Sequence, residues 1–307
     1  MGTFWDTWRK DITRGVALFV AVLAIGLCVR YVVARVREGV VDRLPVALRE
    51  LRGNFDPDVT AGPRTPGETW SYRAKIAPNQ WVWIHNTNGS VTVEPGKGDS
   101  LEVTAMKSYR RSDPASVRLV AVPYDGGVAI CAVWERSQRC GPGEHLKGGS
   151  AHRNDVAVTF TVHLPRRVRV GATTVNGGVR VRGASAPVVA ATVSGDVDAE
   201  TADGPVSAVS VNGSVRARMR AFADTGDVSL FTVNGTATAE LPARLDADVE
   251  ATTVNGSINT DYPLTVTGKY MSHQLRGTVG NGGRRVHITT VNGSINVKKA
   301  GTESPGR

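Results

Sequence analysis

The chain has 307 residues, of which 37 are Lys or Arg and 28 are Asp or Glu, so its formal net charge is +9. It contains 34 Gly but only 6% aromatic residues, a composition that favours short strands and tight turns over helices. A nucleic-acid partner is not expected, because the basic residues are spread along the chain. The charge also fits a solvated surface, or attraction to anionic lipids or wall polymers.

Residues 1–14 form a short tail, and residues 15–34 predict a single transmembrane helix. The run is rich in Val, Leu, Ala, Ile and Phe, and it continues past Arg30 to about the length that spans a bilayer. No small-x-small cleavage site follows it, which disfavours a cleaved signal peptide. Leu27 before Cys28 does not fit the motif of a lipoprotein signal. The membrane is therefore an expected partner, through one span.

Residues 35–69 are interpreted as a juxtamembrane segment and a linker. Apolar positions from Val36 to Leu51 would line one side of a helix interrupted at Pro45, and residues 54–68 are rich in Pro and Gly. The folded domain is expected to span residues 70–299, starting near Trp70, with a disordered tail at 300–307. More Arg residues follow the apolar span than precede it, a bias that by itself argues for a cytoplasmic domain.

Two cysteines, Cys131 and Cys140, bracket a polar loop. A disulfide that closes this loop is the preferred interpretation, and it would persist only in an oxidising compartment. The alternative is two free thiols in a reducing cytoplasm. A metal site is not expected, because C-x-x-C spacing is absent and His145 and His152 have no partner pattern.

Three tryptophans precede this loop and a fourth lies within it: Trp70, Trp81, Trp83 and Trp134. They are candidates for an aromatic platform that binds sugars or a partner. The alternative is that they cover the exposed core at one end of a repeat array, and this alternative is favoured.

The second half of the chain carries one repeated unit of the form Val-Asn-Gly-Ser-Val. Its glycines are Gly177, Gly195, Gly213, Gly235, Gly256 and Gly293, and an earlier relative occurs at Gly89. The successive spacings are 18, 18, 22, 21 and 37 residues, so the last gap is about twice the others. A fixed period of this kind is typical of a solenoid.

Asn-Gly between strands normally indicates a hairpin, in which the side-chain alternation shifts by one at the turn. The sequence shows no shift, because Val209, Val211, Gly213, Val215 and Ala217 keep one parity. We therefore expect the chain to run on through each unit, with the glycine as a coil corner. Stacked coils would align five asparagines in a hydrogen-bonded ladder with a structural role: Asn176, Asn212, Asn234, Asn255 and Asn292.

These repeats, with the segment from Asp155 to Val181 that leads into them, resemble the DUF4097 family of adhesin-like β-strand-repeat proteins. The resemblance covers roughly residues 70–299. It implies an all-β fold, a β-solenoid of the parallel β-helix kind with coils of about 18–22 residues, on the cell envelope and often membrane-anchored, with no catalytic residues assigned.

No catalytic or cofactor-binding residues are predicted, because the sequence shows no nucleophile-and-base pattern, no G-x-S-x-G and no phosphate-binding loop. We expect a non-enzymatic, membrane-anchored envelope protein whose solenoid presents a binding or scaffolding surface. Its expected partner is an envelope polymer or another envelope protein. With the family resemblance, the cysteine pair outweighs the arginine bias and favours an extracytoplasmic domain on the bacterial cytoplasmic membrane. The alternatives are a polysaccharide-active β-helix enzyme and a cytoplasmic membrane-tethered scaffold in envelope-stress signalling.

Overall fold

A computed structural model describes residues 63–134, 139–142, 154–202, 204–221, 226–263, 265–266 and 273–301. The predicted tail, the transmembrane helix at 15–34, most of the linker and residues 302–307 lie outside the described residues. In the part of the chain that is described, no helix is both long and apolar enough to cross a membrane.

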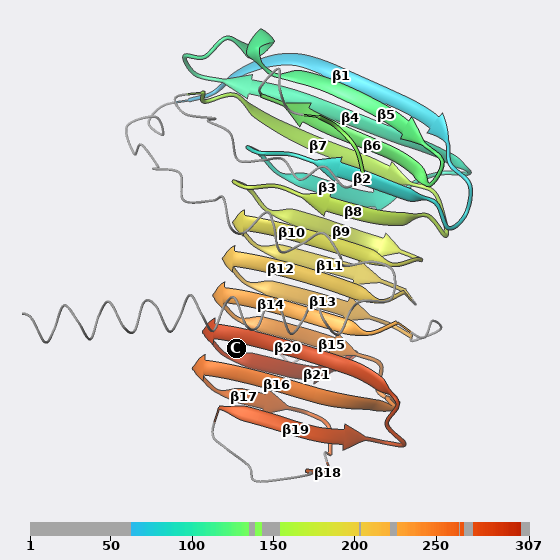
Figure 1. Cartoon of the computed structure of the whole chain (residues 1–307), viewed down its shortest axis with the longest axis vertical. Coiled ribbons are helices and arrows are strands. Elements are labelled where there is room, and N and C mark those ends of the chain that lie inside the picture. Colours follow the sequence, from blue (N-terminus) through green and yellow to red (C-terminus); the bar gives the residue numbers. More distant parts are fainter. Residues whose placement is uncertain are drawn as a thin grey trace, which may run out of the picture. The chain divides into compact units, whose positions relative to one another are not determined.

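The described part of the chain is all-β, as the composition predicts, and its strands form two mostly parallel sheets (Figure 1). In spatial order, sheet A consists of β1 (Thr65–Lys75), β4 (Ser100–Tyr109), β7 (Ala157–Leu164), β3 (Val91–Pro95), β9 (Val179–Ala184), β11 (Val197–Thr201), β13 (Val215–Met219), β15 (Ala237–Leu241), β21 (Ile295–Lys299) and β17 (Ile258–Thr260). Sheet B consists of β18 (Thr265–Val266), β19 (Gln274–Val279), β16 (Ala247–Asn255), β20 (Arg284–Asn292), β14 (Val228–Asn234), β12 (Val206–Asn212), β10 (Val188–Ser194), β8 (Arg169–Thr173), β2 (Trp81–His85), β6 (Gly127–Val133) and β5 (Arg118–Tyr124). A 3-10 turn, η2, spans Pro114–Ser116.

Each coil of the solenoid contributes one strand to each sheet, and the core lies between the two sheets. The coil β10–β11 buries Val188 and Ala190 from sheet B, and Val197 and Ala199 from sheet A. The next coil pairs with it in parallel register, with Val188 opposite Val206 and Val197 opposite Val215. Repetition of Val and Ala at these positions therefore builds one continuous apolar core.

The coils do not stack in chain order. At the N-terminal end, the coil β2–β3 lies between β6–β7 and β8–β9. At the C-terminal end, the coil β20–β21 lies between β14–β15 and β16–β17. The first and the last coil are thus each inserted between two others, and both therefore have paired neighbours on both sides.

Antiparallel strands close the ends of the stack. β1 pairs with β4 and β5 with β6, while β19 pairs with β16 at the other end. The edge strands β1 and β5 contain Pro66 and Pro123, which lack the N–H that would recruit a further strand. The first strand begins at Thr65 and not, as expected from the sequence, near Trp70. Pro66 was assigned to the linker, but an edge strand tolerates a proline.

The predicted side-chain parity is wrong, although the conclusion drawn from it is right. Before the corner of the coil β12–β13 the inward residues are Ala208 and Ser210, whereas Val209 and Val211 face outward. After the corner the inward residues are Val215 and Ala217. The parity shifts because the chain leaves sheet B and enters sheet A at Gly213, which interrupts the pleat. The two strands lie in different sheets, so no hairpin forms.

Candidate functional site

The six corner glycines form a column in which each lies against a glycine of the neighbouring coil. A Cβ on Gly177 would lie 2.4 Å from the carbonyl oxygen of Gly89, and one on Gly195 would lie 2.3 Å from that of Gly177. The column continues, in spatial order, through Gly213, Gly235, Gly293 and Gly256. These contacts exclude any side chain, so the glycines serve close coil stacking.

The structure brings four of the five candidate asparagines into one ladder. Asn234 Nδ2 donates to Asn212 Oδ1 at 2.8 Å, Asn292 Nδ2 donates to Asn234 Oδ1 at 2.8 Å, and Asn255 Nδ2 donates to Asn292 Oδ1 at 2.9 Å. Asn176 lies apart from them, because Ser194 occupies the coil between Asn176 and Asn212. The ladder lies on the exposed surface of the stack, and each of its bonds joins one coil to the next.

Buried hydroxyl groups three residues before each of the six corner glycines form a second ladder, which the sequence analysis missed. Thr192 Oγ1 donates to the carbonyl oxygen of Gly177 at 2.7 Å, and Thr232 Oγ1 donates to that of Gly213 at 2.7 Å. Equivalent bonds are made by Thr174, Ser210, Thr290 and Thr253. The recurring Thr or Ser before Val-Asn-Gly was the available signal, and it was overlooked because valine was assigned inward.

The four tryptophans divide into two pairs with different roles. Trp70 packs against the core from the edge strand β1 and stacks on Tyr72, with ring centroids 6.1 Å apart. Trp134 is buried in the core. These two cover the N-terminal end of the core, as favoured from the sequence. Trp81 and Trp83 instead lie on the outer face of sheet B, away from the core.

Trp81, Trp83 and His85 form an aromatic row along β2. The rings of Trp81 and Trp83 are nearly parallel with centroids 5.0 Å apart, and those of Trp83 and His85 are 5.9 Å apart. Trp83 lies over the bare backbone of Gly171, where a Cβ would come within 2.0 Å of the indole. The guanidinium of Arg169 lies 5.9 Å from the Trp81 ring centroid, within cation–π range. These contacts hold the row in place; Trp81 and Trp83 remain part-exposed, whereas His85 is buried.

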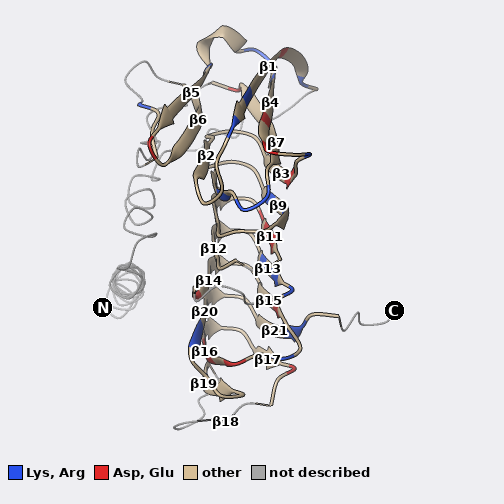
Figure 2. Cartoon of the chain, turned by 90° about the vertical axis from the view of Figure 1, so that its right-hand side faces the viewer, with Lys and Arg blue, Asp and Glu red and all other residues tan. Residues whose placement is uncertain are grey.

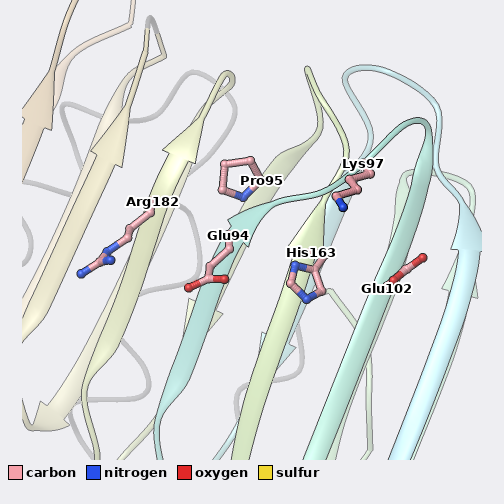
Figure 3. A pocket seen from close by; sticks show the side chains of 6 residues that line it. All are labelled: Glu94, Pro95, Lys97, Glu102, His163 and Arg182. Carbon is pink, nitrogen blue, oxygen red and sulfur yellow. The ribbon is translucent and has the colours of Figure 1, made fainter.

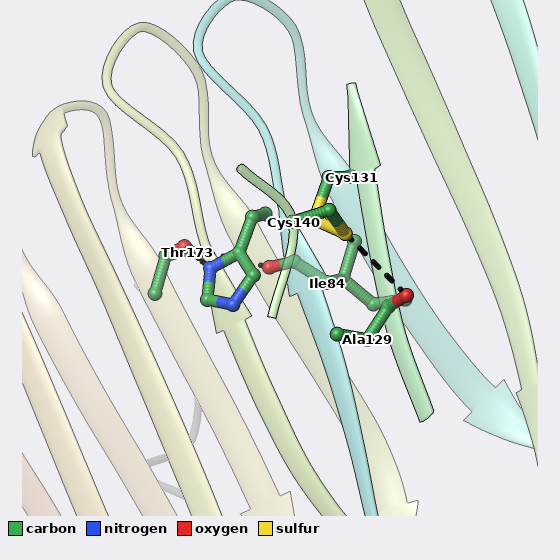
Figure 4. The surroundings of a disulfide bond; sticks show 6 residues. Ile84, Ala129, Cys131, Cys140 and Thr173 are labelled. Atoms are coloured by element: carbon green, nitrogen blue, oxygen red, sulfur yellow. Dashed lines mark hydrogen bonds between the residues drawn. A yellow bond between two sulfur atoms is a disulfide. The ribbon is translucent and has the colours of Figure 1, made fainter. Parts of the chain in front are cut away.

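A disulfide joins Cys131 and Cys140 beside this row, with their Cα atoms 5.8 Å apart (Figure 4). It fixes residues 139–142 against the outer face of β6, where Cys140 Sγ lies 3.5 Å from the carbonyl oxygen of Ala129. We regard this as a packing contact, because a disulfide sulfur carries no proton. On the next strands, His85 Nδ1 lies 2.9 Å from Thr173 Oγ1.

The apolar character of this face continues along the solenoid. The strands β10, β12 and β14 contain no charged residue. Val209 is opposite Phe231 in the ladder, and both are part-exposed, as are Val211 and Val233. Val254, at the same position of a later coil, is 57% exposed. We call the part-exposed residues Trp81, Trp83, Val209, Val211, Phe231 and Val233 the sheet B ridge.

The outer face of sheet A is charged instead, with signs that alternate between strands (Figure 2). Glu200 of β11 is opposite Arg218 of β13, and Arg218 is opposite Glu240 of β15. Arg218 Nε lies 3.0 Å from Glu240 Oε2, and Arg220 Nη2 lies 2.9 Å from Glu200 Oε1. Cross-strand pairs of this kind stabilise a solvated sheet face modestly.

Near the C-terminal end of sheet B, Glu250 lies between two basic groups. It forms an ion pair with Arg276, and His287 Nδ1 lies 3.6 Å from its Oε2. Burial lowers the pKa of His287 more than Glu250 raises it, so this imidazole favours its neutral form. Among the described residues, no group of three or more His, Cys, Asp or Glu side chains is arranged to hold a metal ion.

The fold and these surfaces define a β-solenoid repeat protein whose candidate sites lie on its outer faces. Residues 157–298 match the family model described as Toastrack DUF4097. This match covers a little less than half of the chain, and it confirms the resemblance inferred from the repeats. No curated protein matches the chain.

Two solved structures are similar to this one. A candidate cell adhesion protein from Clostridium sporogenes ATCC 15579 is 11% identical with a TM-score of 0.43, and the match covers 76% of this chain and 100% of that chain. A candidate adhesin from Bacteroides fragilis NCTC 9343 is 12% identical with a TM-score of 0.25, over 76% of this chain and 97% of that chain.

Proposed function

We propose that the protein is a non-enzymatic binding or scaffolding module of the bacterial cell envelope, anchored by the apolar segment at residues 15–34, and that the sheet B ridge contacts another envelope protein. The observation that carries this proposal is the part-exposed apolar face shared by neighbouring coils, with Val209 beside Phe231 and Val211 and Val233 following on the same strands.

The chemistry of the ridge suits a protein partner better than a polymer. Aromatic and aliphatic side chains without charges are typical of the centre of a protein interface. Phe231, Val211 and Val233 offer few hydrogen-bonding groups to a sugar chain. The ridge stands on a continuous parallel sheet whose hydroxyl and amide ladders are satisfied internally, so little conformational freedom is lost on binding.

Site-directed photocrosslinking tests the ridge. A benzoylphenylalanine residue at Phe231 is expected to give a discrete protein adduct in intact cells. The same residue at Thr161, which is part-exposed on the outer face of sheet A, serves as the control and is expected to give none. Adducts at both positions, or at neither, would contradict the assignment of this face.

The disulfide supports an extracytoplasmic domain, because a Cys131–Cys140 bond persists in an oxidising compartment. Labelling of the two cysteines by a membrane-impermeant maleimide in intact cells, in a Cys28→Ser background, tests this placement. Labelling that requires prior treatment with an impermeant reductant is the expected result. Free thiols that react only after lysis would instead place the domain in the cytoplasm.

A further inference from the structure

Two depressions on the outer face of sheet A meet at Glu94, Pro95 and Arg182. The first runs across the strands β4, β7, β3 and β9, where His163 lies between Glu94 and Glu102 (Figure 3). The second continues over the ends of β7, β3 and β9 and is lined by Arg166, Arg167 and Ser185 among others. Four basic side chains therefore surround one continuous hollow: Lys97, Arg166, Arg167 and Arg182.

These four cations differ from three arginines of the neighbouring coils on the same face. Arg216, Arg218 and Arg220 of the neighbouring coils form ion pairs with Glu240 or Glu200. Within the described ranges, no ion pair joins a carboxylate to any of the four cations around the hollow, although all are exposed. Of the two carboxylates that line it, Glu102 is paired with Arg73 at 2.7 Å. The hollow thus holds positive charge that the fold does not neutralise.

A β-bulge gives Arg182 its exceptional position. Ala199 is opposite Val181, but Thr201 is opposite Ala184, so β9 carries one extra residue at this point. Gly183 within the bulge has φ +57°, and a Cβ there would lie 2.6 Å from Pro95 Cγ. The bulge displaces Arg182 from the ladder of alternating charges, and bulges commonly re-aim a side chain in this way.

Arg167 is held in a left-handed backbone conformation, with φ +59°. This conformation is unfavourable for a residue with a long side chain and is usually occupied by Gly or Asn. Hydrogen bonds fix it on both sides, since its N–H donates to Ser185 Oγ at 2.9 Å and its carbonyl accepts from the Asn79 N–H at 2.7 Å. An arginine at such a position suggests that the guanidinium itself is needed.

We propose that this arginine hollow binds the phosphodiester groups of an anionic polyol or glycan polymer. Guanidinium groups match phosphate oxygens in charge and in the spacing of their donors. Glu94 and His163 beside them are suited to the hydroxyl groups that lie between phosphates in such a polymer. The site lies on the sheet opposite the sheet B ridge, so either surface can fail its test without affecting the other.

Binding of glycerol phosphate polymer to the full-length protein in a neutral detergent provides the test. Removing the three arginines together (Arg166→Gln, Arg167→Gln and Arg182→Gln) is expected to weaken binding about tenfold or more, with a smaller dependence of affinity on salt. The matched control removes three ion-paired arginines from the same face (Arg216→Gln, Arg218→Gln and Arg220→Gln) and is expected to change binding less than about threefold.

Equal losses in the two triple variants would overturn the proposal, because they would indicate attraction to net charge alone. It would also be overturned if vesicles containing phosphatidylglycerol, or single-stranded RNA, bound at the arginine hollow more tightly than the polymer.

A single substitution distinguishes the role of the Arg167 guanidinium from that of the left-handed backbone at this position. Arg167→Asn is expected to weaken polymer binding about threefold or more and to raise the melting temperature, because asparagine tolerates the left-handed conformation. Unchanged binding by this variant would contradict a direct role of the Arg167 side chain.

Discussion

Asn292 donates its side-chain hydrogen bond to Asn234, 58 residues earlier, at 2.8 Å. Asn255 comes between them in the sequence, yet it lies on the far side of Asn292 and donates to it at 2.9 Å. The C-terminal coil β20–β21 is thus an inner coil of the stack, and the preceding coil β16–β17 is the outer one.

Hydrogen exchange of the full-length protein is expected to follow this spatial order. The amides of β21, which pairs with β15 and β17, should exchange more slowly than those of β17, which lies at the edge of sheet A. The expected difference in rate is about tenfold or more. Faster exchange in β21 than in β17 would contradict the insertion and favour stacking in chain order.

The glycine column predicts a large loss of stability at one glycine and almost none at the adjacent glycine. Gly177→Ala is expected to lower the free energy of unfolding by about 2 kcal/mol or more, because its Cβ would lie 2.4 Å from a backbone oxygen. Gly178→Ala should change it by less than about 0.5 kcal/mol, because other repeats have Ser214 or Thr236 there and the 3.2 Å contact with the Asp196 carbonyl needs only a small adjustment. Urea unfolding measures both, and similar losses would refute the column.

The buried hydroxyl ladder is tested at Thr232. Thr232→Val keeps the side-chain volume but removes the donor to the Gly213 carbonyl, and should cost about 1 kcal/mol of stability. Thr232→Ser retains the hydroxyl and serves as the control, with a smaller loss expected from its missing methyl group. If the valine variant proved as stable as the wild type by thermal unfolding, the hydrogen bond would have no net effect.

Asp155 predicts a defined pH dependence of stability. Burial by itself would raise the pKa of its carboxyl group, but backbone N–H donors of Arg110, Arg111 and Ser112 and the hydroxyl of Ser112 lower the pKa overall. A lowered pKa contributes stability that is present above the unfolded value of about 4 and is lost as the pH falls through the folded value.

Asp155→Asn is therefore expected to cost about 1–3 kcal/mol at pH 7, because an amide has only one acceptor oxygen for these donors. The difference from the wild type should shrink as the pH falls below about 4. Asp99→Asn, at an exposed position, is the control with little change at either pH. A cost independent of pH would show that the charge of Asp155 is not involved. Chemical denaturation at pH 7 and pH 3 distinguishes these outcomes.

The repeats by themselves determined the all-β class, the coil corners and the resemblance to the DUF4097 family, because a unit such as Val-Asn-Gly-Ser-Val must satisfy the same local backbone requirements wherever it occurs. The spacing of Gly195 and Gly213 by 18 residues was enough to indicate the length of one coil. Four of the five asparagines lie in one ladder as predicted, whereas Asn176 is separated from them by Ser194. The doubled gap before Gly293 was visible, but it carried no information on where that coil lies.

Only the tertiary structure decided the order of the coils, the direction of the valines and the two candidate surfaces. Any repeat can pair with any other, so the insertion of β20–β21 depends on which edges β14 and β16 leave open. Val211 is apolar but faces outward, because the turn at Gly213 shifts the pleat by one residue. Arg166 and Arg182 meet at one hollow because the bulge at Gly183 and the left-handed Arg167 bring two strand ends together, and these local distortions have no signature in the repeat.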